Sequence, residues 1–150
     1  MKSVAKNFNL DGENLNLKNL ITAAHNLDTR FKINQKVRPK ILKSRQWVER
    51  IQEQGTPVVY GINTGFGSKA MVSITQGKLK ELQRNLIMSH AAGTGEALPI
   101  EVVRAAMLLR INTFAKGYSG VRLELIDTLI QMLEKGVVPW IPEQGSLGAS

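Results

Sequence analysis

Cysteine is absent from the 150-residue sequence, which excludes disulfides, thiolate nucleophiles and cysteine-ligated metal sites. Long apolar runs are missing too. No segment approaches the roughly 20 apolar residues of a membrane span, and the start of the sequence holds no apolar stretch typical of a signal peptide. These absences predict a soluble, cytoplasmic chain in a reducing compartment, with no membrane partner.

Acidic residues are scarce relative to basic ones: 12 Asp and Glu stand against 20 Lys and Arg, a formal net charge of +8. Such a charge raises the question of a nucleic-acid partner. The basic residues are spread out, however, and their densest stretch, residues 32–50, contains one tryptophan and no nucleic-acid motif. We therefore interpret this stretch as the solvated face of a helix and expect no nucleic-acid partner.

The sequence is rich in apolar residues that follow helical spacing. Hydrophobic residues make up 43% of the sequence, a normal share for a globular domain, and they recur every three or four positions. Glycines follow three of the expected helices, at positions 55, 117 and 136, and can stop them. The pattern predicts five helices, over residues 15–26, 37–54, 75–92, 100–115 and 121–135.

A single short strand, "PVVY" at residues 57–60, interrupts this helical pattern. The sequence shows no internal repeat and no low-complexity tract. The predicted fold class is therefore mainly α, with at most one short strand and a glycine-rich loop, and 150 residues suffice for one ordinary core.

Two glycine-rich loops stand out, "YGINTGFG" at residues 60–67 and "GVVPWIPEQGSLGAS" at residues 136–150. The first loop does not have the G-x-G-x-x-G spacing of a dinucleotide-binding turn, and no Lys-Ser or Lys-Thr follows as in a P-loop. Its glycines allow a close approach of the backbone to a ligand, but from these residues alone a plain connection is equally open.

Four segments, in this order, resemble the aromatic amino acid ammonia-lyases, and histidine ammonia-lyases most closely. They are "YGINTGFG", then "QRNLIMSHAAGTGE", then "RINTFAKGYSGVR", then "PEQGSLGAS" at the end of the sequence. The resemblance covers the chain from about residue 56 onward. It implies a helical lead-in over about residues 1–55. Residues 56–150 would then carry the catalytic loop, the substrate pocket and the cofactor-forming segment of an amino-terminal part.

The resemblance implies a cofactor made from the chain itself, 4-methylidene-imidazol-5-one, with no metal and no external cofactor. In these enzymes an Ala-Ser-Gly triplet cyclises with loss of water, and the serine then loses its hydroxyl as a second water. Ala149 and Ser150 match the first two positions. We expect a glycine to follow them in a longer protein.

The resemblance also implies roles for four further residues. Tyr60 matches the tyrosine that removes the β-proton of the substrate. Ser89 and His90 match the pair that faces the substrate ring, and this Ser-His pair is typical of histidine ammonia-lyases. Gly67, in the first loop, is assigned to substrate binding. Four arginines could bind a carboxylate, but we expect them at helix surfaces and in inter-helix pairs: Arg84, Arg104, Arg110 and Arg122.

The expected activity is the deamination of L-histidine to trans-urocanate and ammonia by a homotetramer. Two alternatives stay open. One is a phenylalanine or tyrosine ammonia-lyase, or a related aminomutase. The other, from a different class, is a non-catalytic fragment that acts only in subunit association. The 1–150 chain alone is expected to be inactive.

Overall fold

The computed structural model describes residues 7–145, which divide into two compact units. Of these residues, unit 1 comprises 7–45 and Ala97–Ile141, and unit 2 comprises Gln46–Glu96 and 142–145. Helix α2 (Arg38–Gln54) runs from one unit into the other. No helix among the described residues combines the length and the apolar character needed to cross a membrane.

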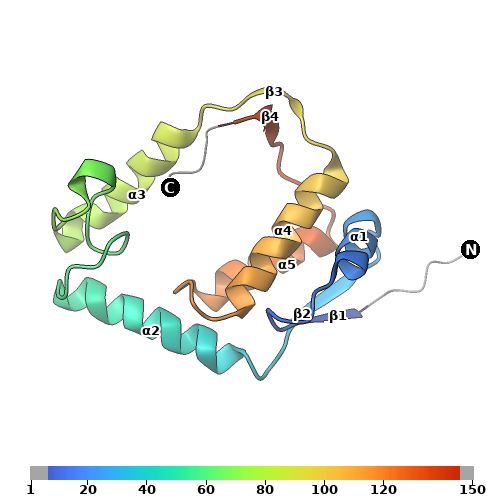
Figure 1. Cartoon of the computed structure of the whole chain (residues 1–150), viewed down its shortest axis with the longest axis horizontal. Helices are drawn as coiled ribbons and strands as arrows, with labels where there is room; N and C mark the ends of the chain where they lie inside the picture. The colour runs from blue at the N-terminus through green and yellow to red at the C-terminus, as the bar shows by residue number, and fades with distance from the viewer. Residues whose placement is uncertain (1–6, 146–150) are drawn as a thin grey trace, which may run out of the picture. The chain divides into compact units, whose positions relative to one another are not determined.

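Unit 1 is built on three helices and a two-stranded parallel sheet. Its elements are β1 (Asn7–Leu10), α1 (Leu17–His25), β2 (Arg30–Ile33), α4 (Ile100–Ala115) and α5 (Leu123–Glu134). Strands β1 and β2 pair in register from Asn7 opposite Arg30 to Leu10 opposite Ile33. Helix α4 packs against both α1 and α5, as Figure 1 shows.

The core of unit 1 forms where these elements meet. The most deeply buried side chains come from all of them, so strands and helices share one hydrophobic interior. Its members include Leu10, Phe31, Ile41, Val103, Leu108, Ile111, Ile126 and Leu133.

A buried arginine ties the helices of unit 1 together. Arg104 is only 1% exposed, and its Nε donates to Ala24 O at 2.8 Å while Nη1 donates to Leu133 O at 2.8 Å. Nη2 lies 3.3 Å from Ala23 O and 3.4 Å from Asn26 O. Burial lowers the pKa of this guanidinium below its usual value. We expected Arg104 at a helix surface or in an inter-helix pair. It is inside the core, and it links α1 and α5 through their carbonyl groups.

Unit 2 holds a long loop, one helix and a strand pair. After α2 the chain makes a loop that contains a short 3₁₀ turn, η1 (Gly67–Lys69), and then forms α3 (Gln76–His90). Strand β3 (Thr94–Ala97) follows α3 and pairs with β4 (Pro142–Gln144), from near the other end of the chain (Figure 1).

The mainly α-helical fold class is confirmed, and each of the five helices lies where its apolar spacing indicated. The glycines after α2, α4 and α5 all have positive φ, from 67° to 78°. The strand predicted at residues 57–60 is wrong, because this segment is an irregular loop ending in a turn. The four strands that form within residues 7–145, each of three or four residues, were not predicted.

Candidate active site

The loop between α2 and α3 is organised around one buried amide, that of Asn63, which is 2% exposed. Its Nδ2 donates to Gly55 O at 3.1 Å and to Pro57 O at 3.0 Å, and its Oδ1 accepts from Val59 N at 2.7 Å. These bonds hold residues 55–59 in an irregular path, which explains why "PVVY" does not pair as a strand.

The backbone of Asn63 makes two more bonds. Its N–H donates to Val59 O at 3.2 Å, and its carbonyl accepts from Ile74 N at 2.9 Å, just before α3 begins. Thr64, also buried, pairs with Ser73 in an isolated antiparallel bridge. The loop is therefore closed on itself, with Asn63 joining the segment that leaves α2 to the segment that enters α3.

Tyr60 lies at the turn of this loop, and its side chain is 58% exposed. Its ring meets the edge of the Phe66 ring, with centroids 5.8 Å apart and planes at 72°. The phenol oxygen makes no hydrogen bond to any of residues 7–145. The ring is thus positioned by an aromatic contact, and the exposed side chain leaves its hydroxyl available to a ligand.

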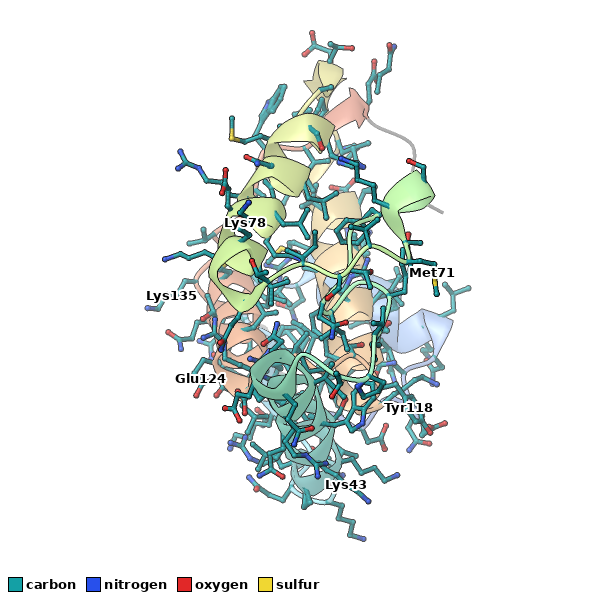
Figure 2. The ribbon with its side chains drawn as sticks, turned by 90° about the vertical axis from the view of Figure 1, so that its left-hand side faces the viewer. Lys43, Met71, Lys78, Tyr118, Glu124 and Lys135 are labelled. Atoms are coloured by element: carbon teal, nitrogen blue, oxygen red, sulfur yellow. The ribbon has the colours of Figure 1, made fainter. Side chains whose placement is uncertain are left out.

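Glycines shape the loop on both sides of Phe66. Gly61 has a φ of +77° and Gly67 a φ of +57°, conformations that other residues rarely adopt. Around the position of a Gly67 Cβ, no atom lies within 4 Å, so Gly67 presents an open backbone surface. Met71, further along, is 84% exposed and extends away from the ribbon in Figure 2.

Ser89 and His90 form the last turn of α3. The Ser89 hydroxyl donates to Leu86 O at 2.8 Å. The Nδ1 atom of His90 lies 2.9 Å from the same carbonyl and 3.0 Å from Ser89 Oγ. Both side chains are exposed, and they are held against the end of the helix by these bonds.

This geometry selects one form of the neutral His90 ring. A carbonyl oxygen can only accept, and the Ser89 hydroxyl hydrogen is already directed at Leu86 O, so Nδ1 must carry the proton that satisfies these contacts. Nε2 then has a lone pair, and within residues 7–145 it has no hydrogen-bond partner. The imidazole consequently offers an acceptor to a ring that can donate an N–H or O–H.

The strand pair β3–β4 brings together two of the four quoted segments. Gly93 and Gly95 lie against β4, where a Cβ on Gly93 would overlap the ring of Pro142 and one on Gly95 would lie 2.9 Å from Glu143 Cγ. The residues just after Ser89 and His90 therefore lie beside the residues that lead into "GSLGAS". Ala149 and Ser150 themselves lie outside the described residues.

The structure places Ser89 and His90 in direct contact with each other, but it shows no such contact between this pair and the other expected site residues that it describes. Tyr60, Gly67, Ser89 and His90 all belong to unit 2. No hydrogen bond or ring contact among the described residues links Tyr60 to the Ser89–His90 pair. Residues 7–145 contain no group of three or more His, Asp or Glu that could hold a metal ion. Sequence reasoning missed Asn63, although an asparagine between two glycines is itself a turn signal.

The chain thus combines a helical scaffold with a tyrosine on a glycine-rich loop and a Ser-His pair at a helix end. The chain belongs to the aromatic amino acid lyase family, whose family model matches residues 15–150.

Individual members of the family show to which enzymes the chain is similar. The chain is 49% identical over 143 residues to the histidine ammonia-lyase of Streptococcus gordonii, which covers 95% of this chain and 28% of that protein. The crystal structure of histidine ammonia-lyase from Trypanosoma cruzi is similar with a TM-score of 0.83 and 36% identity, covering 93% of this chain and 26% of that one. Tyrosine aminomutase from Streptomyces globisporus gives a TM-score of 0.84 and 36% identity, covering 95% and 26%. The chain therefore spans little more than a quarter of the length of these relatives.

Proposed function

We infer that this chain supplies the ring-recognition and proton-transfer residues of a histidine ammonia-lyase. The complete protein would convert L-histidine to trans-urocanate and ammonia, as a cytoplasmic homotetramer. The observation that carries this proposal is the pair Ser89–His90, whose hydrogen bonds engage His90 Nδ1 and leave Nε2 as an acceptor on an exposed imidazole. The 49% identity to a histidine ammonia-lyase supports the same substrate.

Substrate recognition follows from the His90 ring. With Nδ1 engaged by Leu86 O and Ser89 Oγ, Nε2 can accept a hydrogen bond from an N–H of the substrate imidazole. A phenylalanine ring has no donor and would leave this acceptor unpaired, which a site built for a polar ring penalises strongly. Gly67, which bears no side chain and has open space beside it, would allow the substrate to approach the backbone.

Tyr60 is the proposed general base for the β-proton. Its phenol is exposed, and its ring is held at an angle by Phe66, so its oxygen could reach a bound substrate without breaking an existing bond. Removal of this proton is difficult, and positioning the base is the contribution that the protein makes.

The electrophile of the reaction would be 4-methylidene-imidazol-5-one, built from Ala149, Ser150 and a following glycine. Ala149 and Ser150 stand in the order that this chemistry requires, and serine is the residue whose side chain can become the methylene. When formed, the group supplies an acceptor for the substrate amine and so improves it as a leaving group. The pairing of β4 with β3 supports the proposal, because it anchors the segment that precedes these residues next to the one that follows His90.

A second candidate is an aminomutase or a phenylalanine or tyrosine ammonia-lyase. The similarity to tyrosine aminomutase, at a TM-score of 0.84, favours it as the runner-up, since the fold alone does not discriminate these chemistries. The hydroxyl of a tyrosine substrate could also donate to His90 Nε2. The non-catalytic alternative is an association fragment.

The test is to supply the complete protein with L-histidine and to measure urocanate and ammonia together with the intact mass. The proposal expects both products in equal amounts and a mass two waters below that of the sequence. The Ser150→Ala variant, which keeps the backbone but cannot form the methylene, should show neither the products nor the full mass deficit. Active protein of unmodified mass would refute the proposed cofactor. Ammonia without urocanate would refute the elimination, and neither product from L-histidine would refute histidine as the substrate.

A further inference from the structure

We propose that Asn63 is a positioning residue for Tyr60, acting through the loop backbone rather than by touching the substrate. This inference rests on the proposed role of Tyr60 as the general base. Asn63 is 2% exposed, so it cannot itself meet a ligand without a rearrangement of the loop.

The hydrogen bonds of Asn63 hold the backbone just before Tyr60. On the amino-terminal side, its Oδ1 and its N–H bind the N–H and the C=O of Val59, the residue directly before Tyr60. Its Nδ2 fixes Gly55 O and Pro57 O further upstream. Every donor and acceptor of the amide side chain is therefore used within a few residues of Tyr60, and only an amide at this position offers that combination.

The backbone of Asn63 also connects this loop to the segment before α3. The Asn63 carbonyl accepts from Ile74 N, and α3 begins at Gln76. The Tyr60 side chain contacts the Phe66 ring and is more than half exposed. Without the Asn63 amide, the carbonyls of Gly55 and Pro57 and the N–H of Val59 lose their partners. The turn at Tyr60 then keeps only the bonds within residues 59–64, from Ile62 N and Asn63 N to Val59 O and from Gly61 N to Thr64 Oγ1. A displacement of about 1 Å in a catalytic group can reduce the rate about a hundredfold.

The experiment compares Asn63→Ala with two other variants of the complete protein. Asn63→Ala should lower kcat for L-histidine about 10- to 100-fold, with KM changed by less than about threefold and the two-water mass deficit intact. With L-histidine deuterated at the β-carbon, its primary isotope effect on kcat should rise, because proton removal becomes slower than the other steps. Asn112→Ala is the matched control. It removes an amide that accepts from Gly12 N in unit 1, and it should leave the isotope effect unchanged.

A double-mutant cycle with Tyr60→Phe separates positioning from a merely structural role. In the Tyr60→Phe background, Asn63→Ala should lower kcat by less than about threefold, since the group that Asn63 positions is gone. If the two effects multiply, or if Asn63→Ala shows the isotope effect of the parent, the inference is overturned. Asn63→Asp, which keeps the size and one acceptor but loses the amide donor, serves if the alanine variant does not fold. Normal turnover of Tyr60→Phe would refute the proposed base instead, whereas an impaired Tyr60→Phe beside a normal Asn63→Ala would refute this inference alone.

Discussion

Replacing Arg104 by methionine should weaken unit 1 more than any surface substitution. Methionine approximates the aliphatic stem of arginine but has no donor for the carbonyls that Arg104 binds. Ala23 and Ala24 lie in the last turn of α1, and Leu133 lies in the last turn of α5, where carbonyls have no partner within the helix. The positive charge of Arg104 also faces the negative ends of both helix dipoles.

The magnitude follows from the two short bonds. Each 2.8 Å bond from the charged guanidinium to Ala24 O or Leu133 O is worth about 1.5–3 kcal/mol. Their sum of about 3–6 kcal/mol is partly offset, because methionine avoids the cost of burying a charge. A net loss of about 2–5 kcal/mol remains. This corresponds to a roughly 30- to several-thousand-fold larger opening constant.

Amide hydrogen exchange measures this loss locally. In Arg104→Met, the protected amides of α1 and α5 should exchange faster by up to that factor, while those of α3 in unit 2 serve as an internal reference. The matched control is Arg110→Met on the same helix. Arg110 is exposed, and its guanidinium carbon lies 5.9 Å from the Phe114 ring centroid. Its replacement should therefore cost only about 0.5–1 kcal/mol of stability, the contribution of an exposed cation–π contact. Equal protection in the two variants would refute the role of Arg104 as the link between the helices.

Three further predictions concern separate features. Tyr60→Phe should lower kcat for L-histidine by about 100-fold or more while the two-water mass deficit persists, as steady-state assays and intact mass will report; near-normal turnover would reject the base. The N–H groups of Glu13 and Asn14 bind the Asp11 carboxylate and lower its pKa in the folded state. The ionised carboxylate therefore stabilises the fold at a pH above its unfolded pKa. This stabilisation is lost as the pH falls through the lower pKa of the folded state. Asp11→Asn should therefore reduce the urea midpoint at neutral pH but not at pH 2, and an equal reduction at both would contradict this. The 1–150 chain made alone, with Ile87 and Met88 exposed on α3, should self-associate and show no lyase activity, whereas a sharply melting monomer would argue against it.

Helix positions could be predicted because the signals are local. The stop glycines 117 and 136 and the apolar repeat of α5 lie within single helices or next to them, and the structure has the helices where these signals put them. The strands could not be predicted in the same way. Residues 57–60 have strand-like composition, but the buried amide of Asn63 binds the backbone groups that a strand partner would need. Strands β1 and β2 pair across the whole of α1, which no local pattern reveals.

The candidate site shows the same limit. The residues Tyr60, Ser89 and His90 could be chosen from the family resemblance, but the bonds of His90 to Leu86 O and Ser89 Oγ depend on the helix end that they share. Arg104 looked like one more surface arginine, because its partners are carbonyls from two distant segments of unit 1, the end of α1 and the end of α5. Hydrogen bonds between a side chain and backbone carbonyls far away in the sequence cannot be predicted from the spacing of residues.

The central claim is that Ser89 and His90 select a histidine ring, and substrate preference tests it most directly. The measurement is kcat/KM of the complete protein for L-histidine, L-phenylalanine and L-tyrosine, before and after the pair is replaced by Phe-Leu. We expect histidine to be preferred by the unmodified enzyme. The replacement should lower its kcat/KM by about 5- to 150-fold, the cost of leaving one buried polar group unpaired, and should raise that of phenylalanine. A preference of the unmodified enzyme for phenylalanine or tyrosine would contradict the histidine assignment.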